Sequence, residues 1–351
     1  MFPRRCASGP FAGYLAALLI MGCMTCAAST AAAMPNGSEA VSGASVQGEV
    51  AFEPSAAEAS VPERFRLKPH RFPYEQQPVP TAAVKMLQFD VRFPSPITSP
   101  HPENNTVHCE YYRPAAEGRY PATIVLHILG GDFDLMRLYC RTLAQHGVCA
   151  LFIKLPYYGP RRPPGMRERM VTTDPTQTVA RMTQGVLDIR RAAAWLAAQP
   201  EVDEQRLGVF GISMGGITAA LSSAIEPRLH NAFFMLAGAD MRHANWNARE
   251  LRPALEAWQQ KGGTVDTLCE MLRPVDPASY GQRLQRRNIR MMSCRYDEVI
   301  PPACAEALWK SCGEPPIVWL DAGHYTAARF IFDSLSEVTA FFQQARPLPS
   351  E

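Results

Sequence analysis

Short apolar runs alternate with amphipathic stretches from residue 122 onward, and this alternation limits the fold more than any other feature. The apolar runs predict strands that are buried on both faces; they span residues 122–129, 148–155, 206–212, 231–236, 289–294 and 317–320. Segments with helical spacing lie between them, the longest over 176–199, where Pro200 ends it. Strands that alternate with helices predict an α/β fold, with a mostly parallel sheet and helices on both faces.

Two more strands are predicted ahead of the parallel ones. Residues 84–93 and 106–112 alternate between apolar and polar side chains, which is typical of an antiparallel pair and brings the expected sheet to eight strands. The stretch 241–280 interrupts the alternation and has helical spacing over 249–260. We therefore expect one folded domain over residues 81–346, with a small helical cap inserted at about 241–280 and a tail at 347–351.

The first 33 residues have the three-part layout of a secretory signal peptide. They contain no Asp or Glu, they begin with Arg4 and Arg5, and an apolar run over 11–25 is followed by small residues. That run is shorter than the ~20 residues of a membrane-spanning helix. We expect export, to the periplasm or outside the cell. A lipoprotein anchored through Cys23 is the alternative, and Met21 fits that motif poorly; membrane attachment is expected only in that case.

Residues 34–80 are rich in Ala, Ser, Gly, Glu and Pro and show no sustained period, so we expect a flexible linker. The chain has 35 basic and 33 acidic residues, a balance that argues against a nucleic-acid partner. Seven cysteines lie beyond the signal segment, an odd number that allows one or two disulfides. No cysteine or histidine cluster has the spacing of a zinc site, so no metal is expected.

The strand over 206–212 leads into Gly211-Ile212-Ser213-Met214-Gly215, a G-x-S-x-G motif between a strand and a helix. Glycines flank the serine because a side chain at either position would clash in so tight a turn. Ser213 is therefore a candidate nucleophile. A serine hydroxyl needs a base to remove its proton, and that base is commonly a histidine oriented by a carboxylate.

The chain supplies both partners at the ends of later strands. Asp297 follows the strand 289–294 and His324 follows the strand 317–320, where open α/β sheets place their sites. Asp240, which ends the preceding strand, is the alternative acid. Glu298 is expected to be a solvated neighbour of Asp297.

With nucleophile, acid and histidine in this order, residues 81–346 resemble an α/β-hydrolase. The resemblance implies that Ser213 is the nucleophile, Asp297 the orienting acid and His324 the general base. The segment Tyr157-Tyr158-Gly159-Pro160-Arg161-Arg162-Pro163 and the single insert are similar to the dienelactone-hydrolase and acetyl-xylan-esterase branches.

The segment His127-Ile128-Leu129-Gly130-Gly131-Asp132 resembles the family's HGGG-type oxyanion loop, with Ile128 and Leu129 in place of the first glycines. The oxyanion donors are then expected to be the backbone N–H of Met214 and that of Leu129 or Gly130. His127 is expected to order this loop by hydrogen bonding, and a contact with substrate is the alternative to a purely structural role.

Four further side chains are candidates for substrate binding because they follow strands that end at the same edge or lie in the predicted cap. Tyr158, Arg161 and Arg162 come after the strand 148–155, and the arginines suit a substrate carboxylate. An alternative role for the arginines is in salt bridges that fix the loop. Trp246 lies in the cap region and is a candidate lining residue.

The sequence thus predicts an exported serine hydrolase that cleaves a small-molecule carboxylic ester through an acyl-enzyme, without a metal or cofactor. Two alternatives stay open. One is a serine peptidase of the prolyl-oligopeptidase type, although residues 34–80 are too short for the large gating domain such enzymes carry. The other is a catalytically silent binding module on the same fold.

Overall fold

The computed structural model describes residues 45–81, 83, 85–167 and 169–349. The predicted signal peptide at 1–33, the lipoprotein alternative at Cys23, the first part of the predicted linker and the last two residues lie outside these described residues. Within the described part, no helix has both the length and the apolar character to cross a membrane.

The fold is organised around one sheet of ten strands, in the order β1-β2-β3-β4-β6-β5-β7-β8-β9-β10. β5 to β10 pair in parallel, and β1 to β4 are antiparallel to their neighbours. The strands are β1 (Val46–Phe52), β2 (His70–Val79), β3 (Met86–Pro94), β4 (Thr106–Pro114), β5 (Tyr120–Leu126), β6 (Cys149–Ile153), β7 (Val202–Ile212), β8 (Asn231–Met235), β9 (Asn288–Cys294) and β10 (Ile317–Leu320).

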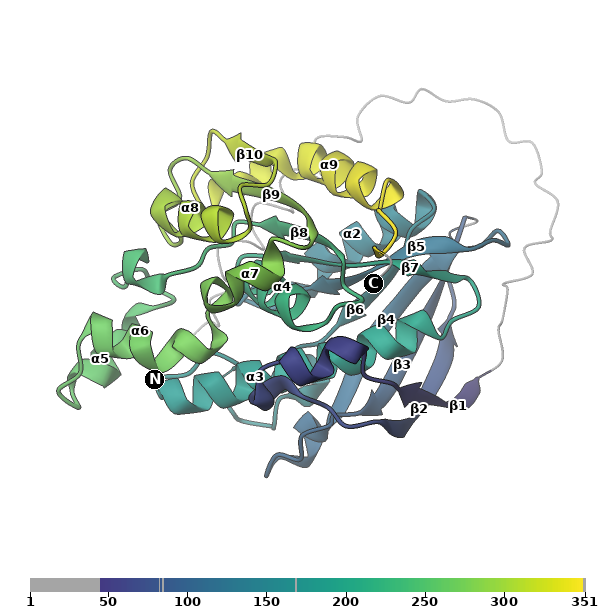
Figure 1. Ribbon diagram of the computed structural model, residues 1–351, viewed down its shortest axis with the longest axis horizontal. Helices are drawn as coiled ribbons and strands as arrows, with labels where there is room; N and C mark the ends of the chain where they lie inside the picture. The colour runs from purple at the N-terminus through teal and green to yellow at the C-terminus, as the bar shows by residue number, and fades with distance from the viewer. Residues whose placement is uncertain (1–44, 82, 84, 168, 350–351) are drawn as a thin grey trace, which may run out of the picture.

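Helices cover both faces of this sheet (Figure 1), which confirms the predicted fold class. The α-helices are α2 (Phe133–Gln145), α3 (Pro175–Ala197), α4 (Met214–Ile225), α5 (Arg252–Gln259), α6 (Val265–Leu272), α7 (Gly281–Leu284), α8 (Pro302–Ser311) and α9 (Ile331–Gln343). Short 3-10 helices are η1 (Ala56–Ser60), η2 (Glu63–Phe65), η3 (Pro102–Asn105), η4 (Gly159–Arg161), η5 (Met241–His243), η6 (Arg273–Val275), η7 (Pro277–Tyr280) and η8 (Thr326–Phe330).

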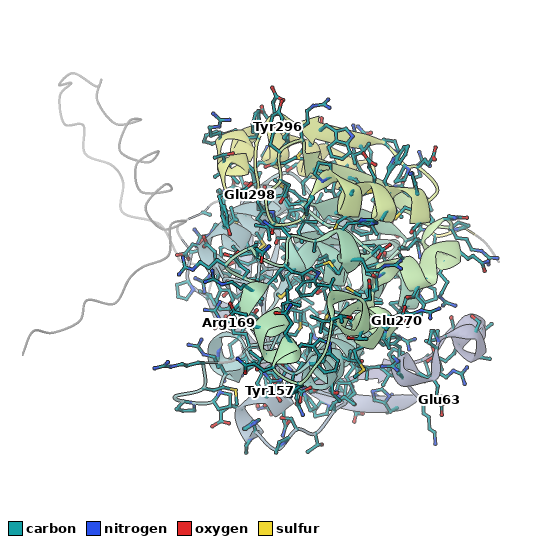
Figure 2. The ribbon with its side chains drawn as sticks, turned by 90° about the vertical axis from the view of Figure 1, so that its left-hand side faces the viewer. Glu63, Tyr157, Arg169, Glu270, Tyr296 and Glu298 are labelled. Carbon is teal, nitrogen blue, oxygen red and sulfur yellow. The ribbon has the colours of Figure 1, made fainter. Side chains whose placement is uncertain are left out.

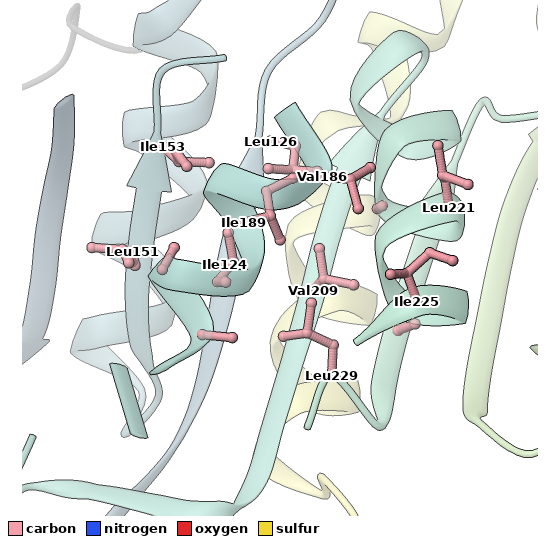
Figure 3. Close-up of a cluster of buried hydrophobic side chains, with 14 of the residues drawn as sticks. Ile124, Leu126, Leu151, Ile153, Val186, Ile189, Val209, Leu221, Ile225 and Leu229 are labelled. Atoms are coloured by element: carbon pink, nitrogen blue, oxygen red, sulfur yellow. The ribbon is translucent and has the colours of Figure 1, made fainter. Parts of the chain in front are cut away.

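The two faces of the sheet have separate hydrophobic cores because successive side chains of a strand point to opposite sides. Ile124 and Leu126 of β5 pack against α3 and α4, whereas Val125 of the same strand packs in the core that holds α2 and α9. Figure 3 shows the first core, where Val186 and Ile189 of α3 lie close to β5. The near-continuous apolar runs of the sequence thus correspond to strands buried on both sides.

The predicted linker is wrong for its described part, because residues 45–80 belong to the domain. β1 pairs with β2 and β2 pairs with β3, so the sheet has two more strands than predicted. Phe52, Phe65 and Phe72 are fully or almost fully buried against the α3 face. Arg190 of α3 binds the Glu58 carboxylate, at 2.8 Å from Nη1 to Oε1. Val50 and Val61 are buried as well. The polar composition of this stretch concealed these few buried apolar residues.

The stretch 241–280, where a cap is predicted, consists of the short helices η5, α5, α6, η6 and η7. These helices surround a small hydrophobic core. Trp246, Leu255 and Leu268 pack there against Val299 and Ile300, so the cap sits directly on the loop that follows β9. All seven cysteines among the described residues are free thiols, and none of the disulfides that the sequence allows is present there.

Candidate active site

The turn between β7 and α4 holds Ser213 in a strained backbone conformation, with φ +56° and ψ −120°. Its glycine neighbours are required by space. A Cβ on Gly211 would lie 2.2 Å from the Gly215 carbonyl oxygen, and a Cβ on Gly215 would lie 2.5 Å from that of Leu126. Non-glycine residues at positive φ are uncommon and cost of order 1–3 kcal/mol. The turn therefore stores strain where it presents the serine hydroxyl.

His324 contacts both of its predicted partners. Its Nε2 lies 3.0 Å from Ser213 Oγ, and its Nδ1 lies 2.8 Å from Asp297 Oδ2. Because a carboxylate accepts hydrogen bonds, Nδ1 carries the proton and Nε2 presents a lone pair to the serine hydroxyl. The three side chains that the sequence singles out come together from three separate strand ends, in the arrangement of a catalytic triad.

Asp297 is fixed by the backbone that follows it. Its Oδ1 accepts the N–H groups of Val299 at 2.9 Å and Ile300 at 2.7 Å. These bonds leave Oδ2 directed at His324 and compensate the burial of the carboxylate. The alternative acid, Asp240, binds Arg242 instead, at 2.6 Å from its Oδ1 to Nε. The structure thus places Asp297, and not Asp240, beside the histidine.

Glu298 is exposed, as predicted for a solvated neighbour of Asp297, and it also contacts the loop that carries His324. Its Oε2 accepts the backbone N–H of His324 at 2.8 Å. A Cβ on Gly323 would lie 2.3 Å from the same oxygen, so the glycine leaves the space that the carboxylate occupies. Figure 2 shows Glu298 near Tyr296 on the C-terminal part of the ribbon. Glu298 therefore holds the loop that carries the candidate base.

The segment after β5, which is predicted to be an oxyanion loop, forms a turn beside the cavity that Ser213 lines. Gly131 closes a turn by donating its N–H to Ile128 O at 2.9 Å, with φ +72°. Met214 is the first residue of α4, where a backbone N–H has no partner within the helix. Leu129, Gly130 and Met214 all line the same cavity as Ser213. The N–H groups of these three residues remain the candidate oxyanion donors.

His127 fixes this loop in a single tautomer. Its Nε2 accepts the N–H of Leu155 at 3.1 Å, so the proton lies on Nδ1 and is donated to Ile128 O at 2.9 Å. Complete burial lowers the pKa of His127 to about 3, which keeps the imidazole neutral. As the sequence predicts, this histidine orders the candidate oxyanion loop, and it does not line the cavity.

Tyr158 also supports the oxyanion loop and does not line the cavity, contrary to its predicted role in substrate binding. Its hydroxyl donates to Leu129 O at 3.0 Å, and its ring packs on His127 with centroids 4.4 Å apart. Arg169 donates to the same carbonyl at 2.8 Å. Because the peptide is planar and trans, two donors on Leu129 O fix the direction of the Gly130 N–H. No sequence motif marked Arg169.

The two arginines after β6 have different surroundings from those predicted. Arg161 is fully buried and binds Asp188 Oδ2 at 2.8 Å, as well as the carbonyls of Lys154 and Asn104. It locks the loop, which was the alternative role, and it does not reach substrate. Arg162 is exposed and lies outside the cavity lining. The prediction of a carboxylate site at these arginines is therefore wrong.

A cavity of about 1240 Å³ opens over Ser213 and His324. Trp246 lines it, in agreement with its predicted position, and donates its indole N–H to Met241 O at 2.8 Å. Cys269 also lines the cavity, but burial raises the pKa of its thiol to about 11, so it is a poor nucleophile. Among the described residues, no cluster of His, Cys, Asp or Glu is arranged to hold a metal ion.

Two protein-family models match overlapping parts of the chain. The dienelactone hydrolase family matches residues 108–246, which include the oxyanion loop and Ser213. The prolyl oligopeptidase family matches residues 181–345, which include Ser213, Asp297 and His324.

Curated relatives and solved structures extend this likeness. Two uncharacterized proteins of Mycobacterium tuberculosis, from strains CDC 1551 and H37Rv, are each 28% identical over 178 residues; the match spans 48% of this chain and 40% of each relative. The acetyl xylan esterase of Paenibacillus sp. R4 has a TM-score of 0.61 at 20% identity, over 78% of this chain and 89% of that one. Acetyl xylan esterase 1 of Thermoanaerobacterium sp. JW/SL YS485 has a TM-score of 0.58 at 18% identity, over 76% and 87%. At these identities, the likeness to the solved structures is one of fold.

Proposed function

We propose that this chain, which belongs to the α/β-hydrolase superfamily, cleaves a carboxylic ester through an acyl-enzyme on Ser213. One observation carries the proposal: two hydrogen bonds link Ser213 Oγ through His324 to Asp297 at the wall of a large cavity. A catalytically silent binding module would not need a strained serine that is hydrogen-bonded to a histidine with its proton on Nδ1, nor a buried carboxylate that accepts this proton.

In the first half of the proposed reaction, Ser213 Oγ attacks the ester carbonyl while His324 Nε2 takes the hydroxyl proton. Asp297 stabilises the imidazolium that forms. The negative charge on the carbonyl oxygen is met by the Met214 N–H and one N–H of the oxyanion loop; one such donor is worth about 10²–10³ in rate. His324 then returns the proton to the leaving alkoxide, and the alcohol departs.

In the second half, the acyl-enzyme is hydrolysed. Water replaces the alcohol, His324 Nε2 takes one of its protons, and the resulting hydroxide attacks the acyl carbonyl. Collapse of the tetrahedral intermediate breaks the bond to Ser213 Oγ, which recovers its proton from His324. The products are a carboxylic acid and the free enzyme.

The test is turnover of 4-nitrophenyl esters by the full chain beside Ser213→Ala. We expect burst release of nitrophenol in the wild type and a loss of kcat of about 10⁴ or more in the variant. Ser222→Ala is the matched control, because this serine lies in α4, the helix that follows Ser213, and its buried hydroxyl has no partner among the described residues. Equal turnover by Ser213→Ala and wild type would overturn the proposal.

A second candidate is a serine peptidase, which the prolyl oligopeptidase match over 181–345 favours. In that case Ser213 would attack an amide carbonyl, and His324 would protonate a leaving amine in place of an alkoxide. Peptide 4-nitroanilides distinguish the two: ester turnover without anilide turnover supports the esterase, and comparable kcat/KM on both supports the peptidase.

We also propose that the protein is exported, with residues 1–33 as the signal. The support is the layout of the sequence described above. Cell fractionation of the full chain tests this: loss of the first 33 residues together with a periplasmic or extracellular location is the expected result. Retention of the segment in a cytoplasmic fraction contradicts it, and lipid attached at Cys23 supports the lipoprotein alternative.

A further inference from the structure

The cavity over Ser213 is larger than an acetyl group needs. Its volume is about 1240 Å³, against roughly 300–1,000 Å³ for a typical site that holds a drug-sized molecule. The cavity is large because it has two walls, one on each face of the sheet. β7 is an inner strand of the sheet, so Ser213, at its end, lies between the two walls.

The first wall belongs to the cap and α3. Trp246, Leu251, Leu268 and Leu272 of the cap line it, together with Met182 of α3. Apart from the indole N–H of Trp246, these side chains carry no hydrogen-bond donor, and that N–H is bonded to Met241 O. This side of the cavity therefore offers an apolar surface.

The second wall lies on the opposite face, where α2 meets the start of α9. Leu135 and Tyr139 of α2 line it, with Ala327, Ala328 and Ile331 from η8 and α9. The Tyr139 hydroxyl lies 2.7 Å from Ser334 Oγ, so it is already engaged within the protein. The cavity thus presents apolar surface on both sides of the candidate nucleophile.

The remaining polar groups of the lining are mostly satisfied or at the opening. The Thr178 hydroxyl accepts the N–H of Thr172 at 3.0 Å, and the Thr172 hydroxyl donates to Asp174 O at 2.8 Å. Arg169 donates to Leu129 O. Arg167 and Arg249 are exposed, so their charges lie where the cavity meets solvent. The Glu250 carboxylate interacts with the Tyr325 hydroxyl, and only its Oε2 is a buried acceptor of this lining without a hydrogen-bond partner among the described residues. A single acceptor suits one hydroxyl, whereas a sugar brings several that need partners.

We propose that the site takes an ester with an apolar group on each side of the carbonyl, a medium- or long-chain or aromatic acid joined to an apolar alcohol, rather than an acetylated sugar. This inference rests on the proposed esterase function. It differs from what the names of the two structural relatives suggest, since their likeness to this chain is one of fold.

Kinetics of the full chain provide the first test. We expect kcat/KM for 4-nitrophenyl octanoate to exceed that for the acetate by at least about tenfold. Each CH₂ group that is buried raises the equilibrium constant for transfer from water to an apolar site roughly fourfold. An equal gain is expected from methyl to octyl alcohols at constant acyl group. Preference for acetate, or faster deacetylation of an acetylated xylo-oligosaccharide, would overturn the inference.

Two variants fill the two sides separately. Ala254 lines the cap side and Ala328 the α2–α9 side, and both are only half-buried. Ala254→Trp and Ala328→Trp should each reduce one of the two length preferences by about tenfold, one for the acid and the other for the alcohol. Ala254→Leu and Ala328→Leu, with smaller effects in the same direction, replace any variant that does not fold. Unchanged preferences in all folded variants contradict the inference.

Binding separates this inference from the esterase proposal. Ser213→Ala is titrated with 4-nitrophenyl octanoate and with the acetate, and we expect at least about tenfold tighter binding of the octanoate even when turnover is absent. Tight octanoate binding without wild-type turnover means that the function proposal fails and the cavity inference stands. Equal binding of both esters means that the cavity inference fails, whatever the activity.

Discussion

The His324–Asp297 pair and the Arg161–Asp188 pair are both buried, and each has a member in a segment that follows a strand, yet they differ in what surrounds them. Arg161 contacts Asp188 and the carbonyls of Lys154 and Asn104. His324 contacts Asp297 on one side and faces Ser213 and the cavity on the other.

This difference shows that the position of a polar side chain after a strand does not decide whether it stabilises the fold or faces the cavity. All the hydrogen-bond partners of Arg161 named above are groups of the protein, so this side chain stabilises the loop after β6. His324 keeps its Nε2 for the Ser213 hydroxyl. We expect disruption of the first pair to reduce stability and disruption of the second to reduce rate, and paired substitutions test this division.

The largest expected effect is on rate, from Asp297→Asn. The amide would donate a hydrogen bond to His324 Nδ1 and favour the tautomer with the proton on Nε2, which cannot accept the serine proton. We expect kcat to fall by about 10⁴, with the free energy of unfolding changed by no more than about 1 kcal/mol. Ester kinetics and urea unfolding measure the two quantities. A variant that keeps kcat within tenfold of wild type would remove Asp297 from the triad.

Asp188→Asn is the matching change in the other pair. It leaves the Arg161 charge buried without its counter-ion, and we expect a loss of about 3–5 kcal/mol in the free energy of unfolding. The kcat of the folded protein should stay within about twofold of wild type. Replacing both residues, as Arg161→Met with Asp188→Leu, should recover much of the stability. A large fall in kcat with intact stability would place this pair in the catalytic machinery after all.

A third substitution addresses another locked cluster, where Glu226 binds Arg190 and Arg228. Burial acts to raise the pKa of Glu226, but the pairing with Arg228 and Arg190 outweighs it and lowers that pKa to about 2 from 4.5. The stabilisation, about 3 kcal/mol, is complete above pH 4.5 and is lost as pH falls from there toward 2.

Glu226→Gln should therefore be less stable than wild type at pH 7, and the difference should shrink as pH falls below 4.5. Urea unfolding at pH 7, 5, 4 and 3 measures this. A stability difference that is the same at every pH would show that the charge of Glu226 does not contribute.

The smallest expected effect concerns Glu298, which positions the candidate base without contacting substrate. Glu298→Ala removes the acceptor of the His324 N–H, and we expect kcat to fall about tenfold, the rate equivalent of about 1.5 kcal/mol for a hydrogen bond to a charged group. KM should be unchanged, and Glu298→Gln, which keeps an acceptor oxygen, should recover most of kcat. A rise in KM in place of a fall in kcat would indicate contact with substrate.

The sequence predicted the fold class, and it singled out the three side chains that the structure brings into contact at His324, because both depend on local patterns. Buried parallel strands leave continuous apolar runs, and the turn at Ser213 needs glycines at fixed spacing. Asp297 and His324 were found because chain order and strand ends are also local features. The choice between Asp297 and Asp240 was decided only by the contact with His324.

The parts that the sequence did not predict depend on long-range contacts. β1 pairs with β2, β2 pairs with β3, and the segment is buried on α3, which leaves little periodicity in a polar stretch of sequence. Arg169 and Glu298 act on backbone groups of distant loops, at Leu129 O and the His324 N–H. A side chain that binds a backbone atom far along the chain has no sequence signature.

The most direct measurement of the central claim is covalent labelling of the full chain with a fluorophosphonate, followed by peptide mapping in a mass spectrometer. The proposed triad predicts one adduct, on Ser213, that is absent from Ser213→Ala and forms far more slowly in His324→Gln. An adduct on a different serine, or ester hydrolysis by a protein that the reagent leaves unmodified at Ser213, would contradict it.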